Sequence, residues 1–282
     1  MEKTRVAIVG MGTVGTGVAR LLLDHGDRLA RHAGRILWLE KATVRDIGKD
    51  RGIELPAGIL TDDLKSILND RSIEVVALLV GGLEPARTIM LQLLEAGKDV
   101  VTANKALLAE HGEELFDRAR ALGRTIAFEA SVGGGIPIIA NISQCFSANQ
   151  ILSLRGILNG TSNYIISQMD EQGADYAVAL KLAQELGYAE ADPTMDVDGS
   201  DAAQKLAILA HLAFGVRVRW RDIYRCGLEA FQLADLKYAS ELGYRINCEL
   251  LTVIVSRGKS TSLSFARMPG ALIERTVSSP VE

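Results

Sequence analysis

An aspartate and a lysine four residues apart are the first residues that could carry proton chemistry. Asp201 and Lys205 belong to Ser200–Phe214, whose leucines recur at the spacing of an amphipathic helix. Residues four apart share one helix face, so the carboxylate and the amine would stand side by side. One interpretation is an exposed ion pair. The other is a pair against the core, beside Leu206 and Leu209, where burial and charge coupling tune a lysine for proton transfer. The spacing leaves both open.

A glycine-rich loop near the start of the chain predicts a nucleotide site. Gly10–Gly15 reads GMGTVG, the pattern G-x-G-x-x-G, and lies between a predicted strand, Arg5–Val9, and a predicted helix, Val14–Leu29. An ordinary glycine-rich turn is the alternative. The order of strand, loop and helix favours a dinucleotide.

Each part of this loop has a physical task in dinucleotide binding. Gly10 permits a tight turn, Gly12 lets a pyrophosphate approach the backbone, and Gly15 lets helix and strand pack closely. The N–H groups that open the helix, at Thr13 and Val14, then face the phosphates.

The segment after the second predicted strand carries charges of both signs. Trp38–Val44 is followed by Arg45 and Asp46, with Lys49 close behind. An acid at this place often binds the adenosine ribose, whereas an arginine can bind a 2′-phosphate. A solvated turn is the alternative. The basic residues lead us to expect NADPH as the cofactor, with NADH acceptable.

Two further segments have the composition of ligand sites. Lys105 follows the predicted strand Asp99–Thr102 and opens a helix, where a cation is disfavoured unless a polar or anionic ligand is near. Glu129 precedes three glycines, Gly133–Gly135. That run is either a flexible hinge or a loop whose carbonyls, with the Glu129 carboxylate, bind a hard cation.

Strands and helices alternate through the first half of the chain, and the pattern changes after Ser131. Alternation at this spacing predicts a doubly wound parallel α/β sheet of the Rossmann type. The second half predicts an α+β arrangement, with helices around a sheet. We therefore expect an NAD(P)-binding domain over residues 1–130 and a second domain, of the α+β class, over residues 131–282.

Composition argues against several classes of protein. The 31 Lys and Arg residues against 35 Asp and Glu lack the basic excess of a nucleic-acid partner. The sequence contains no run of 18 apolar residues that would predict a membrane span, and its N-terminus lacks a signal-peptide pattern. Cys145, Cys226 and Cys248 are far apart and predict packed thiols rather than disulfides. A cytoplasmic protein fits best.

Several segments together resemble the homoserine dehydrogenase family. They are the Gly10–Gly15 loop, VTANKALLA around Lys105, EASVGGGIPII from Glu129, GILNGTSNYI from Gly156 and LGYAEADPTMDVDGSDAAQKLAILA from Leu186. The resemblance covers about residues 4–245. It implies NAD(P)-dependent interconversion of L-homoserine and L-aspartate 4-semialdehyde, a step of threonine, methionine and isoleucine biosynthesis. It also implies that residues 131–282 form the substrate-binding, catalytic and dimerisation domain.

The resemblance also implies roles for individual residues. Lys205 matches the catalytic lysine and Asp201 its partner. Lys105 matches a lysine that lies near both the nicotinamide and the substrate. Glu190 and Asp196 match the acids that hold the substrate, with Glu190 facing its ammonium group.

Further matches concern the cofactor and a metal ion. Gly187 matches a cofactor contact. The Glu129 carboxylate and the carbonyls of Val132, Gly134 and Ile136 match a sodium site.

The end of the chain differs from the usual family pattern. It stops at Glu282 without the glycine-rich G-x-G-A-G segment and the final helix, and it has neither an ACT domain nor a fused aspartate kinase. We therefore expect a short form of the enzyme, which is either a truncated chain or a weakened enzyme. The alternatives are a related amino-acid or semialdehyde reductase and a non-catalytic NAD(P)-binding protein.

The segment Ile246–Ala266 predicts two strands joined by the polar residues 257–261. The adjacent Ile254 and Val255 point to opposite faces, so a sheet that helices cover on one side leaves apolar surface on the other. The resemblance implies dimerisation through this sheet. We expect a homodimer built on the second domain, with a packed hairpin in a monomer as the alternative.

Overall fold

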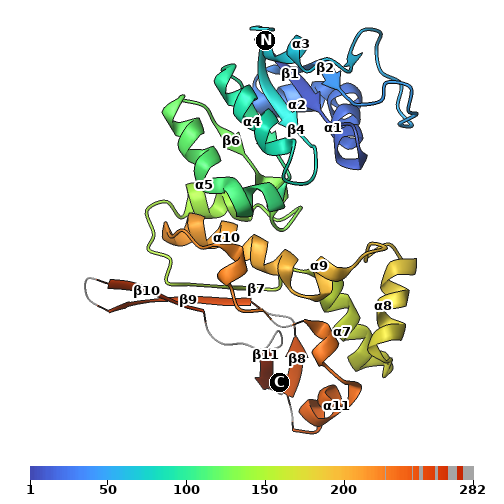
Figure 1. Cartoon of the computed structure of the whole chain (residues 1–282), viewed down its shortest axis with the longest axis vertical. Helices are drawn as coiled ribbons and strands as arrows, with labels where there is room; N and C mark the ends of the chain where they lie inside the picture. Colours follow the sequence, from blue (N-terminus) through green and yellow to red (C-terminus); the bar gives the residue numbers. More distant parts are fainter. Residues whose placement is uncertain (226, 243, 248–249, 258–259, 266–271, 276–282) are drawn as a thin grey trace. The chain divides into compact units, whose positions relative to one another are not determined.

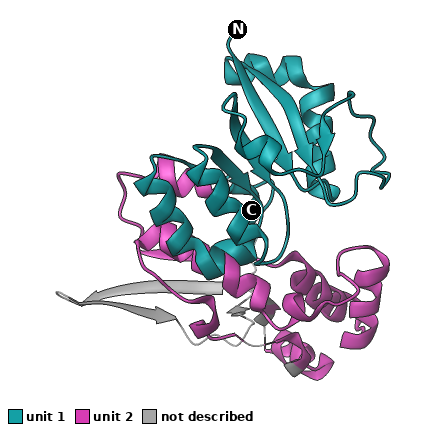
Figure 2. Ribbon diagram, turned by 45° about the horizontal axis from the view of Figure 1, so that its top comes forward, with its two compact units in different colours: residues 1–138 teal, residues 139–282 magenta. Residues whose placement is uncertain are grey.

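Two units make up the chain, Met1–Ile138 and Ile139–Glu282 (Figure 2). The computed structural model describes residues 1–282 except 226, 243, 248–249, 258–259, 266–271 and 276–282 (Figure 1). The predicted boundary after residue 130 lies a few residues before the observed one. The tail predicted over Thr276–Glu282 lies outside the described residues.

The first unit is built on a parallel sheet of six strands in the order β3-β2-β1-β4-β5-β6. The strands are β1 (Lys3–Val9), β2 (Ile36–Thr43), β3 (Leu60–Thr61), β4 (Ile73–Leu78), β5 (Asp99–Thr102) and β6 (Ile126–Ala127). The helices are α1 (Thr13–Asp24), α2 (Gly26–Ala33), α3 (Lys65–Leu68), α4 (Ala86–Glu95) and α5 (Lys105–Ala121). This is the classical Rossmann strand order, so the predicted fold class is confirmed.

In the sheet of the first unit, the order in which successive strands are added reverses between β1 and β4. Val6–Val9 of β1 and Val76–Leu78 of β4 are buried, as expected for central parallel strands. Because βαβ crossovers are right-handed, the helices of the two halves cover opposite faces. The carboxyl ends of β1 and β4 therefore flank the crevice in which such sheets bind ligands.

The second unit combines helices with two small antiparallel sheets, β10-β9-β7 and β11-β8. Its strands are β7 (Ser153–Gly156), β8 (Tyr244–Asn247), β9 (Leu250–Arg257), β10 (Ser260–Phe265) and β11 (Leu272–Arg275). The chain enters through α6 (Ile138–Ala140) and a π-helical turn, η2 (Asn141–Cys145). The longer helices are α7 (Gly160–Gln172), α8 (Tyr176–Glu185), α10 (Ser200–Phe214) and α11 (Leu233–Glu241). Shorter ones are α9 (Thr194–Val197) and the 3-10 turns η3 (Trp220–Asp222) and η4 (Leu228–Ala230).

Helix α10 lies along the β7–β9 sheet (Figure 1). Ala203, Leu206 and Ala207 of this helix are buried with Ile223 in one apolar cluster. Helices α7, α8 and α11 bury a separate cluster that includes Ile165, Ala183 and Leu236. Helix α10 is therefore held in place by the core of the unit. Its polar residues Asp201 and Lys205 contact Asn159 and Leu158 in the connection between β7 and α7.

Several predicted elements differ in the structure. The helix expected over Val14–Leu29 is two helices, because His25 leaves helical geometry at φ −124° and Gly26 starts a new helix. The sequence predicts a helix over Leu228–Leu242, but α11 starts only at Leu233, where Gln232 and Asp235 form a capping box. It also predicts a helix over Ile136–Cys145, behind the three glycines, but the helical residues begin at Ile138, after Pro137.

The strand expected over Ile246–Val255 is divided between β8 and β9, which belong to different sheets. The expected polar connection is shorter, because β9 continues to Arg257 and β10 begins at Ser260. Cys145 is exposed rather than packed, whereas Cys226 and Cys248 lie outside the described residues. Within the described ranges, no helix has the length and apolarity needed to span a membrane.

Candidate functional site

The glycine loop joins β1 to α1 in the geometry that its spacing predicts. Gly10 has φ +96°, in the left-handed region, and its N–H donates to the Thr43 carbonyl at 2.9 Å. Gly15 packs so closely that an added Cβ would lie 2.0 Å from the Gly10 oxygen. Gly12 is the N-cap of α1, and a Cβ there would meet open space. The loop therefore needs Gly10 and Gly15 for its own shape, whereas Gly12 leaves room for a ligand.

A cavity of about 900 Å³ opens at the carboxyl ends of β1, β2 and β4. Gly10 and Gly12 line it, together with Val80 and Gly81 after β4. The first turn of α1, which includes Thr13 and Val14, carries no acidic side chain. Its backbone N–H groups and the helix dipole favour an anion at this end of the cavity.

The far wall of the cavity is charged. Arg45, Lys49 and Arg51 line it, as do the acids Asp46, Asp62 and Glu84. The Arg45 and Lys49 side chains make no hydrogen bond or ion pair with any residue that the structure describes. The Thr88 hydroxyl and N–H donate to the Glu84 carboxylate and hold the pKa of that carboxyl below its usual value. Arg45 and Lys49 are thus the cations available to a ligand here.

Arg51 shapes the loop that carries these cations. Its guanidinium donates to the backbone oxygens of Asp46 and Lys49. Two aspartates turn the same loop, since the Asp46 carboxylate accepts from Gly48 N–H and the Asp50 carboxylate from Gly52 N–H. The loop is therefore held through backbone atoms rather than through Arg45 or Lys49.

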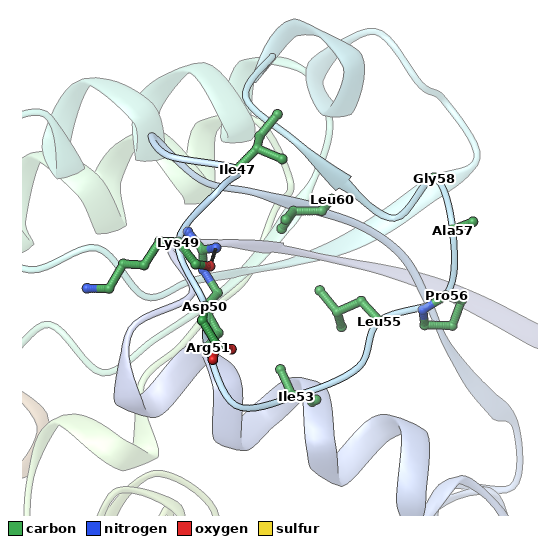
Figure 3. A pocket seen from close by; sticks show the side chains of 10 residues that line it. All are labelled: Ile47, Lys49, Asp50, Arg51, Ile53, Leu55, Pro56, Ala57, Gly58 and Leu60. Carbon is green, nitrogen blue, oxygen red and sulfur yellow. Dashed lines mark hydrogen bonds between the residues drawn. The ribbon is translucent and has the colours of Figure 1, made fainter.

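A smaller cavity of about 340 Å³ lies within the segment Ile47–Leu60 (Figure 3). Figure 3 shows Lys49 extending away from the apolar side chains of Leu55 and Leu60. Leu55 and Leu60 pack against the apolar cluster beneath β2. This cavity therefore belongs to the packing of the loop, and Lys49 lines it as well as the larger cavity.

Lys105 is the first residue of α5 and is half-buried. Its neighbour Asn104 caps the helix by accepting from Leu107 N–H at 3.0 Å. The Asn104 amide also donates to the carbonyls of Val80 and Gly82 after β4. Lys105 does not line the cavity, but its helix start is tied to the segment that does.

In the second unit, the Lys205 and Asp201 side chains meet. Lys205 Nζ lies 2.7 Å from Asp201 Oδ2, and the side chains are 17% and 4% exposed. Lys205 Nζ also donates to the Leu158 carbonyl at 2.7 Å. The interpretation as an exposed surface ion pair is therefore wrong, because Asp201 is buried and Lys205 is only partly exposed.

Asn159 connects this pair to Asp196. Its amide nitrogen lies 2.9 Å from Asp201 Oδ2 and 2.9 Å from Asp196 Oδ1. Its side-chain oxygen accepts from Ser162 N–H at 2.7 Å and caps α7. The structure therefore joins Lys205, Asp201 and Asp196, three of the residues predicted as functional, through one buried amide.

Glu190 and Gly187 lie in the loop between α8 and α9 and are exposed. Gly187 has φ +76°, which favours glycine there. The backbone oxygen of Glu190 accepts from Gln184, and its carboxylate extends into solvent. The Thr161 hydroxyl donates to the Tyr188 carbonyl at 2.6 Å and ties this loop to the start of α7.

The predicted sodium ligands lie in one short segment of the first unit. Glu129 opens a 3-10 turn, and Gly133 and Gly135 reverse the chain at φ 61° and 86°. The Ile136 carbonyl accepts from Ile138 N–H and keeps a second lone pair. A carboxylate with three carbonyls is a donor set that suits a hard cation. Among described residues, no group of three acidic, histidine or cysteine side chains could hold a metal.

Sequence reasoning assigned no role to two residues that the structure makes prominent. Asn159 lies in GILNGTSNYI. Asparagine is a typical residue at the start of a helix, so its role as the cap of α7 could have been predicted from the sequence. Arg51 lies in an irregular loop, and no local pattern distinguishes it from a solvated cation.

The strand order, the glycine loop and the charged crevice together define a dinucleotide-binding protein of the Rossmann type. The family profile described as "Homoserine dehydrogenase, NAD binding domain" matches residues 10–129, and the profile described as "Homoserine dehydrogenase" matches residues 137–264. The chain belongs to the homoserine dehydrogenase family.

Individual relatives agree with this assignment. A homoserine dehydrogenase of Synechocystis is 45% identical over 86% of this chain and 55% of its own length. The solved homoserine dehydrogenase of Thiobacillus denitrificans has a TM-score of 0.85 and 43% identity, covering 93% of this chain and 60% of its own. An Archaeoglobus fulgidus protein solved under the same family name has a TM-score of 0.77 and 33% identity, covering 94% and 85%. The chain spans little more than half the length of the curated relatives it matches.

Proposed function

We propose that this chain interconverts L-homoserine and L-aspartate 4-semialdehyde with a nicotinamide cofactor. The observation that carries the proposal is the buried pair of Lys205 and Asp201, with Nζ and Oδ2 2.7 Å apart, in a chain of this family. A lysine held beside a carboxylate suits proton transfer to a carbonyl oxygen. The reaction belongs to threonine, methionine and isoleucine biosynthesis, and we place it in the cytoplasm.

The chain's own residues then have the following tasks. When bound, the cofactor supplies or accepts the hydride at the substrate carbon. Lys205 stabilises the negative charge that develops on the substrate oxygen and donates a proton to it. Asp201 and the Leu158 carbonyl hold the lysine ammonium group in place. Lys105 provides a second cation for the cofactor and the substrate.

Glu190 and Asp196 serve as the anions that hold the substrate ammonium group. Glu190 is exposed in the loop before α9, and Asp196 is held by Asn159. Charge-assisted hydrogen bonds of this kind are the stronger ones, and they require an amino group on the substrate. A related semialdehyde reductase that acts on substrates without an amino group would not need both acids.

One assay separates this function from its alternatives. Oxidation of NADPH and NADH is followed with L-aspartate 4-semialdehyde, and cofactor binding is measured separately by calorimetry. Turnover supports the proposal. Binding without turnover supports a non-catalytic NAD(P)-binding protein, and turnover only with another semialdehyde supports a related reductase.

We propose that NADPH is preferred over NADH, with NADH still accepted. The support is that Arg45 and Lys49 line the crevice with side chains available to a 2′-phosphate. Gly10, Gly12, Gly15 and the N–H groups of Thr13 and Val14 would hold the pyrophosphate, and Gly187 is proposed as a further cofactor contact. Replacing Arg45 and Lys49 with alanine is expected to weaken binding of 2′,5′-ADP more than that of 5′-ADP.

We propose a sodium site formed by the Glu129 carboxylate and the carbonyls of Val132, Gly134 and Ile136. The support is the hard oxygen donor set within one glycine-reversed turn. The thermal midpoint is expected to rise with sodium chloride more than with choline chloride at equal ionic strength. Equal responses to the two salts would contradict the site.

We propose a homodimer built on the second unit. The support is a small three-stranded sheet, with α10 along one face. Edge strands of such a sheet can pair across a two-fold axis. Light scattering at micromolar concentration is expected to give twice the mass of the chain, and a concentration-independent monomer mass would exclude the dimer.

A further inference from the structure

We propose that Asn159 is a positioning residue that holds the Asp201 carboxylate against Lys205 and connects it to Asp196. This inference rests on the function proposed above. One amide group reaches two carboxylates that come from different elements, α9 and α10, at 2.9 Å each.

The orientation of the Asn159 amide is determined by its surroundings. The side-chain oxygen accepts from Ser162 N–H at 2.7 Å, so the nitrogen must face the two carboxylates. The reverse orientation would set two N–H donors against each other and an oxygen against two anions. Asn159 is 6% exposed, so water does not replace these partners freely.

The Asn159 amide and the lysine meet at the same oxygen of Asp201. Asp201 Oδ2 accepts from Asn159 and also lies 2.7 Å from Lys205 Nζ. The residue before Asn159 supplies the carbonyl that holds the same ammonium group. The connection between β7 and α7 therefore fixes both groups of the proton-transfer pair from one side.

The amide also keeps two like charges in one place. Two N–H donors satisfy Asp196 and Asp201 without adding charge, so both acids stay hydrogen-bonded near each other. A substrate ammonium held by Asp196 would thus be one amide away from the pair that moves the proton. Asn159 therefore connects Asp196, the acid proposed to hold the substrate, to the pair that transfers the proton.

The test replaces Asn159 while keeping its function as a helix cap. Asn159→Ser retains an oxygen acceptor for Ser162 N–H, yet its short side chain cannot reach both carboxylates. Asn159→Asp has the same shape and the same acceptor, but it lacks the two donors and adds a third carboxylate. Asn163→Ser is the matched control, because it makes the same substitution one turn further along α7 at a residue that holds neither carboxylate.

In both Asn159 variants we expect kcat to fall by about 10- to 100-fold, with the cofactor KM unchanged. Asn163→Ser keeps its kcat within about twofold of the parent chain. In the Asp201→Asn background the Asn159→Ser change should cost little more, because both act through one carboxylate. A crystal structure of Asn159→Ser is expected to show the Asp201 carboxylate beyond hydrogen-bond distance of Lys205 Nζ.

Either an unmoved Asp201 carboxylate or an unchanged kcat overturns the inference. Additive losses in the double variant overturn it as well. A parent chain that turns over no semialdehyde contradicts the proposed function instead. The crystal structure of the Asn159→Ser variant then decides the role of Asn159 alone.

Discussion

The carbonyl oxygen of Gly10 lies 2.0 Å from the position that a Cβ atom at Gly15 would take. No side chain fits at that distance, so Gly15 is required by the backbone of its own loop. Gly12, three residues earlier, has no atom within 4 Å of its would-be Cβ. Gly15 therefore serves the fold, whereas Gly12 leaves space for the pyrophosphate contact proposed above.

Alanine at these positions should separate the two purposes. Gly15→Ala is expected to lower stability by about 1–3 kcal/mol, because the loop must move to admit the methyl group. Gly12→Ala should keep the thermal midpoint and lose most NADPH affinity, since the pyrophosphate approaches that backbone. Gly17→Ala, at an exposed position inside α1, is the control and should be at least as stable as the parent. Calorimetric binding and thermal unfolding report both effects, and tight NADPH binding by Gly12→Ala would refute the division.

Lys205→Ala is expected to reduce turnover by about 10²- to 10⁴-fold while sparing cofactor binding. The variant should also unfold at a lower temperature, because Asp201 would remain buried without its cation. Lys181→Ala is a matched control, since Lys181 and Glu185 have the same four-residue spacing on α8 with 77% and 60% of the side chains exposed. Near-normal kcat in Lys205→Ala would make the lysine structural.

Glu190→Gln should raise the KM for homoserine by about tenfold and leave the cofactor KM near its parent value. The charged hydrogen bond to the substrate ammonium is lost, whereas the cofactor does not use this carboxylate. Glu185→Gln, a nearby exposed glutamate on α8, serves as the control. Equal changes in the two KM values would exclude a substrate role.

Stability should depend on pH through the ion pair between α4 and α5. Arg87 donates to both oxygens of Glu114, and this hydrogen bonding holds the pKa of the Glu114 carboxyl below its usual value. A carboxyl whose pKa is lowered by folding stabilises the protein above its unfolded pKa. That contribution is lost as the pH falls through the lowered value.

At pH 7 the parent is therefore expected to have a larger free energy of unfolding than Glu114→Gln. This difference should shrink below about pH 4. Urea unfolding at both pH values measures it. Glu74→Gln, at an exposed strand position, is the comparison. A difference that grows at acid pH would contradict the sign.

Elements with strong local signals could be predicted from the sequence alone. Helix α10 has its predicted bounds, Ser200–Phe214, because Gly199 and Gly215 adopt left-handed geometry at its two ends. The strand β5 also has its predicted bounds, Asp99–Thr102. The glycine loop was recognisable because three glycines with fixed spacing follow a strand.

What the sequence could not reveal depends on contacts between distant residues. The Asn159 side chain hydrogen-bonds to Asp196 and Asp201, which lie 37 and 42 residues later in the sequence, and no local pattern predicts these contacts. Strand β11 exists through its pairing with β8, which only the folded chain brings together. The break at His25 is equally invisible, because the apolar spacing continues across it.

The loop that Arg51 closes has a consequence for how such proteins diversify. Its shape depends on backbone oxygens of Asp46 and Lys49 and on two aspartate turns. Side chains at positions 45 and 49 can therefore drift in evolution without altering the path of the chain. A lineage could exchange one adenosine recognition pattern for another in two substitutions, while the Rossmann frame that presents them is inherited unchanged.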